Sequence, residues 1–193
     1  EPPVYAIIIL LTENCDSLLP TIRSRCVTLT MNPVEKDKIC TYLENKFQLE
    51  PEQAQIAANY CQGNIGKAIR FASSSDFIEM KNQVLKLLKN LDSMDIASII
   101  DTIKEFSTHK NDINDYLDLM LLWYRDVLMF KVTKDANLLL YSDEYSAISE
   151  QATKRDYENI ENIIAAIDKA KVRLKANVNF DVTIELMILA MKD

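Results

Sequence analysis

The segment DINDYLDLMLLWYRDVLMFKVTK, from Asp112 to Lys134, decides the fold of this chain. Its apolar side chains recur every three or four residues, a spacing that places them on one side of an α-helix. The stripe consists of Tyr116, Leu117, Met120, Leu121, Tyr124, Val127 and Leu128. Trp123 and Phe130 widen the stripe beyond one face. The segment therefore predicts a long helix at the centre of a helical domain.

The sequence on both sides of this helix has the same periodicity. Two apolar stripes precede it and one follows it: Val84, Leu85, Leu88 and Leu91; Ile96, Ile99, Ile100, Ile103 and Phe106; Ile160, Ile163, Ile164, Ile167 and Leu174. Each stripe is expected to bury one helix face. The helix that carries Ile96 to Phe106 should start after a cap at Asp92–Ser93. Thr153 and Asp156 resemble a capping box that opens the helix carrying Ile160 to Leu174. A last helix, from Asp181 to Lys192, is apolar on most sides.

Three shorter helices are predicted between residues 35 and 75. Asn32–Pro33 suits a helix start, with asparagine as the cap and proline at the first helical position, and Pro51 opens a second helix. That second helix carries small side chains, which indicate close packing: Ala54, Ala57, Ala58 and Cys61. Gly63 suits the left-handed end of a helix, and Asn64 suits a cap for the next one.

Composition agrees with a mainly α, folded chain. The 193 residues are 48% hydrophobic and 26% charged, and only two are glycine. No run of about 18 uncharged apolar residues is present, so we expect no membrane partner and a cytoplasmic location. The net charge of −7 and the dispersed basic residues disfavour broad direct contact with nucleic acid.

Few residues suit chemistry within this chain. The four cysteines, Cys15, Cys26, Cys40 and Cys61, lack paired Cys-x-x-Cys spacing, so we interpret them as reduced thiols without metal. His109 is the single histidine, which rules out a histidine cluster. The phosphate-binding pattern Gly-x-x-x-x-Gly-Lys-Ser/Thr does not occur, so we expect no bound ATP and no metal or other cofactor in this chain.

An apolar run from Val4 to Leu11 differs from the helical stripes. It has eight apolar residues without a charge, four of them β-branched, which is typical of a strand buried on both faces of a parallel sheet. Leu18 to Arg23 can form one or two helical turns, and Val27 to Thr30 alternates like a short strand. Arg25 therefore lies at the boundary between two elements.

At these residues the chain resembles the AAA+ clamp-loader family of bacterial DNA replication. Three landmarks agree in order and spacing: Glu1-Pro2-Pro3, Leu10-Leu11-Thr12 and Ser24-Arg25-Cys26. The resemblance implies that Thr12 lies at the sensor 1 position. It also implies that Arg25 is an arginine finger, which reaches the ATP held by a neighbouring subunit. Without the family match, Arg25 would be interpreted as a solvated arginine.

The glycine segment resembles sensor 2 of the same family but departs from it. Active ATPase members place an arginine three residues after the first glycine, where this chain has Gly66. The next residue, Lys67, falls at another angle on the helix. This degenerate sensor, formed by Gly63, Gly66 and Lys67, favours a subunit that donates a finger without acting as a motor. The glycines could equally serve a tight turn between helices.

The C-terminal region resembles the collar domain through which clamp-loader subunits assemble. Trp123-Tyr124-Arg125-Asp126 and Leu174 to Phe180 carry this likeness. The resemblance implies three domains: residues 1–34 as a remnant of the α/β AAA+ module, 35–75 as a three-helix lid and 76–193 as an all-helical collar. Arg125 and Asp126 are expected to form a buried ion pair.

The resemblance also implies partners. They are the gamma/tau and delta clamp-loader subunits, with indirect association with the sliding clamp and primed DNA, and the ATP is held by a neighbour. Two alternatives stay open: the corresponding region of the gamma/tau ATPase, and a helical adaptor that never meets nucleotide.

Overall fold

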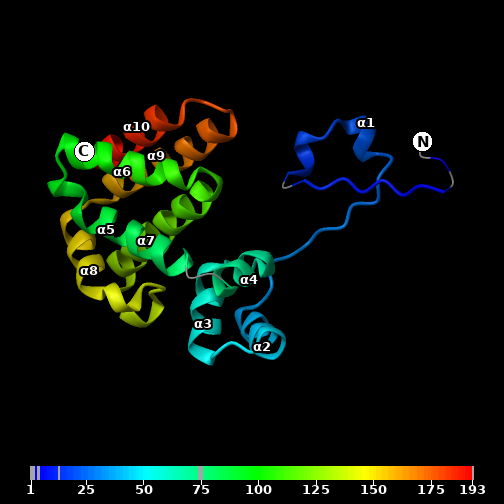
Figure 1. Ribbon diagram of the computed structural model, residues 1–193, viewed down its shortest axis with the longest axis horizontal. Helices are drawn as coiled ribbons and strands as arrows, with labels where there is room; N and C mark the ends of the chain where they lie inside the picture. Colours follow the sequence, from blue (N-terminus) through cyan, green and yellow to red (C-terminus); the bar gives the residue numbers. More distant parts are fainter. Residues whose placement is uncertain (1–2, 4, 13, 74–75, 193) are drawn as a thin grey trace. The chain divides into compact units, whose positions relative to one another are not determined.

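The structure is a computed structural model that describes residues 3, 5–12, 14–73 and 76–192. Helices dominate these residues, and none of them forms a β-strand. The mainly α fold predicted from the sequence is therefore confirmed. The chain divides into two compact units, residues 1–33 and residues 34–193 (Figure 1).

Helix α7 is the centre of the larger unit, as its apolar stripe predicts. Five further helices complete the bundle around it. The six elements are α5 (Asp76–Asn90), α6 (Ile96–Thr108), α7 (Ile113–Thr133), α8 (Tyr145–Lys154), α9 (Tyr157–Lys175) and α10 (Phe180–Lys192). Helix α7 packs against α5, α8 and α9, while α10 packs against α9 and α6. Trp123 and Tyr124 of α7 are completely buried, so the aromatic part of the stripe forms the middle of the core.

The same unit begins with a group of three helices, α2 (Lys36–Phe47), α3 (Pro51–Tyr60) and α4 (Ile65–Ser73). The start predicted at Asn32 is wrong, because α2 begins at Lys36 after an N-cap at Glu35. The N–H of Val34 donates instead to the carbonyl of Gly63, 3.0 Å away, which holds this segment extended beside the turn between α3 and α4.

The remaining predictions for this group are confirmed. Pro51 is the first residue of α3, and the small side chains of that helix are buried. Gly63 has a φ of 82°, in the left-handed region that glycine adopts without strain. The side chain of Asn64 caps α4 by accepting the N–H of Lys67 at 3.0 Å.

Two helix starts in the larger unit differ from the predictions. Asp95, rather than Asp92–Ser93, caps α6 by accepting the N–H of Ser98 at 2.8 Å. Thr153 lies inside α8, where its hydroxyl donates to the carbonyl of Ser149, so Asp156 alone caps α9. Several residues near each boundary can cap a helix, and tertiary packing selects among them.

The α6 stripe is only partly buried. Ile99, Ile103 and Phe106 face the core, but Ile96 and Ile100 are 78% and 47% exposed. The prediction that this stripe buries one face is therefore confirmed for Ile99, Ile103 and Phe106 but not for Ile96 and Ile100. Its outer edge has no cover within the described residues.

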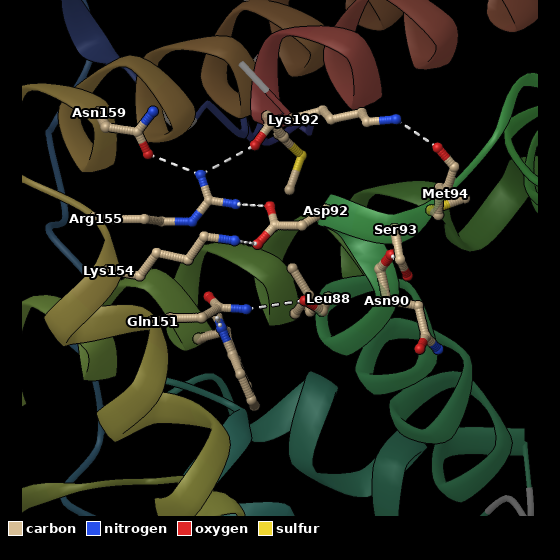
Figure 2. Close-up of polar contacts among 12 residues, drawn as sticks. Leu88, Asn90, Asp92, Ser93, Met94, Gln151, Lys154, Arg155, Asn159 and Lys192 are labelled. Carbon is tan, nitrogen blue, oxygen red and sulfur yellow. Dashed lines mark hydrogen bonds and ion pairs between the residues drawn. The ribbon is translucent and has the colours of Figure 1, made fainter.

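A polar clasp joins the ends of several elements (Figure 2). The buried guanidinium of Arg155 donates to Asp92 Oδ1 at 2.8 Å, in the 3-10 turn η2 (Leu91–Ser93), and to Asn159 Oδ1 at 2.7 Å, in α9. It also donates to the carbonyl of Met191 at the end of α10. The clasp fixes the ends of α9 and α10 against the turn that follows α5.

The smaller unit holds a 3-10 turn, η1 (Cys15–Ser17), and a short helix, α1 (Pro20–Arg23). Strands were predicted at Val4 to Leu11 and at Val27 to Thr30, but the described residues of both segments form none. Both predictions are therefore wrong for those residues. Glu1, Pro2 and Val4 lie outside the described residues. Ile7 and Leu11 are about nine-tenths exposed. A strand needs a partner strand for its backbone hydrogen bonds, and the described chain provides none.

Candidate arginine finger and lid cations

The Ser24-Arg25-Cys26 motif continues the helical turn at the end of α1. The N–H of Arg25 donates to the carbonyl of Ile22 at 3.0 Å, and that of Cys26 donates to the carbonyl of Arg23 at 3.2 Å. The hydroxyl of Ser24 donates to the carbonyl of Thr21. Local hydrogen bonds therefore fix the backbone of the motif, while its three side chains remain exposed.

The structure distinguishes the two arginines of this segment. Arg23 forms an ion pair with Asp16, with 2.6 Å between Nη1 and Oδ1, and so ties α1 to η1. The guanidinium of Arg25 has no ion-pair or hydrogen-bond partner among the described residues. An exposed, unpaired guanidinium on an anchored turn can receive an anion from outside the chain.

Thr12, which the resemblance predicts to lie at the sensor 1 position, has a local structural contact. Its hydroxyl donates to the carbonyl of Asn14 at 2.8 Å and accepts the N–H of the same residue. Asn14 in turn caps η1 by accepting the N–H of Asp16. Thr12 is exposed, and its contacts within this chain stabilise a turn.

Gly66 lies in the first turn of α4, close to the cap of that helix. A Cβ atom at this position would lie 3.3 Å from Asn64 Oδ1, closer than an ordinary van der Waals contact. A larger residue here would press on the cap. Gly66, at the position where the resemblance predicts a sensor 2 arginine, therefore fits closely against the cap.

The side chain of Lys67 points to α7. Its Nζ lies 2.9 Å from Asp115 Oδ1 and also donates to Asp118. Arg70, one turn later on α4, donates to Asp115 Oδ2 at 2.8 Å. Lys171 of α9 pairs with the other oxygen of Asp118 at 2.5 Å. Carboxylates of α7 therefore hold Lys67 and Arg70 of α4 as well as Lys171 of α9.

The sequence analysis missed this cluster. Asp112, Asp115 and Asp118 recur every third residue before the most apolar part of α7, which could have indicated a polar contact. Their partners lie about 40 residues or more away in the sequence, so no local pattern identifies them.

In this cluster, the effect of ion pairing on the pKa values of Lys67 and Asp118 exceeds the opposing effect of burial. Burial disfavours the charged ammonium of Lys67, but hydrogen bonds and charges from Asp118 and Asp115 raise its pKa above the ordinary value. Burial also disfavours the charged carboxylate of Asp118, yet Lys171 and Lys67 lower its pKa below the ordinary value. Both groups are therefore held in their charged forms.

The predicted Arg125–Asp126 pair forms, with 2.8 Å between Arg125 Nη1 and Asp126 Oδ1. The pair is only half buried, because the Arg125 side chain is 46% exposed while Asp126 is completely buried. Asp126 Oδ2 accepts the backbone N–H groups of Leu140 and Tyr141 at 2.7 and 2.8 Å. Burial raises the pKa of Asp126, although these hydrogen bonds oppose the shift. The carboxylate thus holds the loop after α7.

Within the part of the chain that the structure describes, no three or more histidine, cysteine, aspartate or glutamate side chains are grouped so that they could hold a metal ion. No helix within it has the length and apolar character needed to cross a membrane.

Comparisons with known proteins agree with the landmarks of the sequence. A family model described as "DNA polymerase III, delta subunit" matches residues 1–35, the part that contains Arg25. Over the whole chain, the sequence is 30% identical to DNA polymerase III subunit delta' of Bacillus subtilis (strain 168), across 59% of that relative's length.

Two other relatives are more distant. DNA polymerase III subunit tau of the same organism is 22% identical over 68% of the chain and 27% of its own length. DNA polymerase III subunit gamma of Buchnera aphidicola subsp. Schizaphis graminum (strain Sg) is 20% identical over 98% of the chain and 58% of its own length. The chain thus spans less than two thirds of each relative. The resemblance found in the sequence is confirmed: this chain is a homologue of the DNA polymerase III clamp-loader subunits delta', tau and gamma.

Proposed function

We propose that this chain is part of a delta'-like subunit of the bacterial clamp loader and that it donates Arg25 in trans to ATP held by a neighbouring subunit. The observation that carries the proposal is the contrast between the two arginines of the motif. Arg23 is paired with Asp16, whereas the exposed Arg25 side chain has no partner among the described residues. The family match over residues 1–35 supports the same assignment.

The chemistry of Arg25 suits this role. A guanidinium stays charged at all physiological pH values, and its planar fork can donate two hydrogen bonds to phosphate oxygens. Negative charge shifts among these oxygens during phosphoryl transfer, and an arginine placed in trans stabilises that charge. The helical turn at Ile22–Cys26 would hold the finger in a defined direction while the ATP itself stays with the neighbour.

The second part of the proposal is assembly through the collar helices, with gamma/tau and delta subunits as partners in the cytoplasm. Helices α6 and α10 lie side by side and antiparallel: Ser107 donates to Asp181 at one end, and Lys192 donates to the carbonyl of Met94 at the other. Large apolar side chains, between 41% and 78% exposed, gather on this pair: Ile96, Ile100, Val182, Leu186 and Leu189. Apolar faces of this kind are typical of protein interfaces. Sliding clamp and primed DNA would be reached indirectly, through the assembled loader.

The test of the finger is Arg25→Ala in the full-length protein within a reconstituted loader. We expect ATP hydrolysis by the neighbour to slow by at least about a hundredfold, near the low end for arginine fingers. Arg25→Lys should restore little, because lysine lacks the fork. Arg23→Ala should cost less, since it loosens α1 without removing the finger. Equal rates for Arg25→Ala and wild type would mean that Arg25 only serves the local structure.

Two alternatives would give different results. The gamma/tau ATPase is disfavoured by Gly66, and it would show hydrolysis that depends on the subunit's own nucleotide site. A helical adaptor would assemble normally and tolerate Arg25→Ala without loss. Measuring subunit assembly by size-exclusion chromatography beside hydrolysis separates a lost finger from a lost interface.

A further inference from the structure

Helix α1, which leads into the Ser24-Arg25-Cys26 turn, is short and exposed. It has four residues, far fewer than the roughly 12 that a helix needs to be stable by itself. No residue of α1 or of the preceding turn η1 is buried. Apolar packing within the described residues therefore does not set the direction of α1, and its polar contacts become decisive.

One side-chain contact joins α1 to η1 among the described residues. Arg23 Nη1 donates to Asp16 Oδ1 at 2.6 Å, across seven positions of the sequence. Hydrogen bonds between two charged groups are among the stronger polar contacts. The Arg23 and Asp16 side chains are 50% and 83% exposed, however, so solvent limits what the pair contributes.

Both ends of this ion pair are fixed to local structure. On one side, Asn14 Oδ1 accepts the N–H of Asp16 at 2.8 Å, and the hydroxyl of Ser17 donates to the carbonyl of Asn14 at 2.7 Å. On the other side, the carbonyl of Arg23 accepts the N–H of Cys26 at 3.2 Å. The contacts thus run without a break from the cap of η1 to the turn that carries the unpaired arginine.

We propose that Asp16 is a positioning residue, which sets the direction of α1, and hence of the Arg25 guanidinium, through its ion pair with Arg23. The effect on hydrolysis rests on the proposed function, in which Arg25 reaches the ATP of a neighbouring subunit. The order that the pair gives to the turn does not rest on it, so the two proposals can fail separately.

The first test compares Asp16→Ala, Arg23→Ala and the double variant in the full-length protein within a reconstituted loader. We expect each to lower the kcat of ATP hydrolysis by about twofold to fivefold, because an exposed ion pair can shift the population of the aligned turn by no more than that. The KM for ATP should stay within about twofold of wild type, since the nucleotide is held by the neighbour. The double variant should be no slower than either single variant, because all three lack the same pair.

A charge exchange and a matched control make the comparison specific. Asp16→Arg combined with Arg23→Asp rebuilds the pair and should restore most of the kcat. Lys38→Ala breaks another exposed pair, with Glu35 beside α2, whose side chains are 69% and 74% exposed, and should leave the kcat unchanged. A loss in Asp16→Ala without a loss in Arg23→Ala would mean that a freed Arg23 interferes, and would overturn the positioning role. A charge exchange that restores nothing would also overturn it.

Amide hydrogen exchange on the full-length protein tests the pair without relying on Arg25. The N–H groups of Ser24, Arg25 and Cys26 all donate within the turn. We expect exchange in the peptide that covers residues 20–26 to accelerate by about twofold to fivefold in Asp16→Ala and to recover in the charge exchange. Unchanged exchange would overturn the proposal. If exchange accelerates but Arg25→Ala leaves hydrolysis at the wild-type rate, the proposed finger fails while the ordering of the turn by Asp16 stands.

Discussion

Replacing Asp126 by alanine tests the most buried charge in the chain. Asp126 Oδ2 accepts the N–H groups of Leu140 and Tyr141, and Oδ1 accepts from Arg125. Alanine has no acceptor, so all three donors lose their partner. The loop after α7 carries Tyr141, whose ring contacts both Trp123 and Tyr60. A less ordered loop should therefore weaken the packing of the core and the packing of α3 against it.

The size of the effect follows from the burial of each donor. Tyr141 is 1% exposed, so its N–H would be left unsatisfied at a cost of about 1–3 kcal/mol. Leu140 is only partly buried and would recover some hydration, and the half-exposed Arg125 would return to water at little cost. Relief from burying the carboxylate offsets part of the sum. We expect Asp126→Ala to lower the free energy of unfolding by about 2–4 kcal/mol.

The assay is urea unfolding at pH 7, monitored by the fluorescence of Trp123, the single tryptophan. Trp123 is fully buried, and its ring centroid lies 5.5 Å from that of Tyr141. Asp126→Asn is the matched variant, because one amide oxygen can still accept both backbone N–H groups; it should cost about 1 kcal/mol. A loss below about 1 kcal/mol for Asp126→Ala, or an equal loss for both variants, would refute this reasoning.

Two other predictions concern buried polar groups. The hydroxyl of Tyr124 is buried and has no hydrogen-bond partner among the described residues, so Tyr124→Phe should be neutral or stabilise by up to about 1 kcal/mol in urea unfolding. Tyr141→Phe, which loses a 2.9 Å hydrogen bond to the carbonyl of Leu119, should destabilise by about that amount. The lowered pKa of Asp118 means that its contribution to stability is present above its ordinary value of 3.8 and is lost as the pH falls through the folded-state pKa. Stability measured from pH 6 downward should therefore fall less steeply in Asp118→Asn than in wild type.

The sequence predicted the helices well where an apolar stripe meets a core within the same chain. The stripe on α7 required partners on several sides, and α5, α8 and α9 provide them. Helix starts were predicted less well. Asp92, Ser93 and Asp95 have the same local capping chemistry, and the structure uses Asp92 in the clasp with Arg155 while Asp95 caps α6. That choice depends on contacts with residues some 60 positions away, which local sequence does not contain.

The candidate site was predicted by resemblance rather than by physics. Nothing in the local pattern separates Arg23 from Arg25, and only the structure reveals that one is paired and the other is not. Lys67 was predicted to fall at another angle than a sensor 2 arginine, and its partners in the structure, Asp115 and Asp118, both lie on helix α7. Those contacts follow from how α4 packs, which periodicity alone does not determine.

The charges and apolar surfaces of this chain therefore divide into two classes with opposite consequences. In the ionic cluster of Lys67, Arg70 and Lys171 with three aspartates of the Asp112–Asp118 segment, every cation already has a carboxylate partner, so an anion from outside would compete with contacts that the fold already makes. Arg25 and the outer faces of α6 and α10 have no such partners among the described residues, so contact with another molecule would cost them no internal bond. Side chains whose charges are already paired suit a structural role. Exposed side chains without partners among the described residues suit binding. The proposed donation of Arg25 and the proposed assembly through α6 and α10 both draw on groups of the second class.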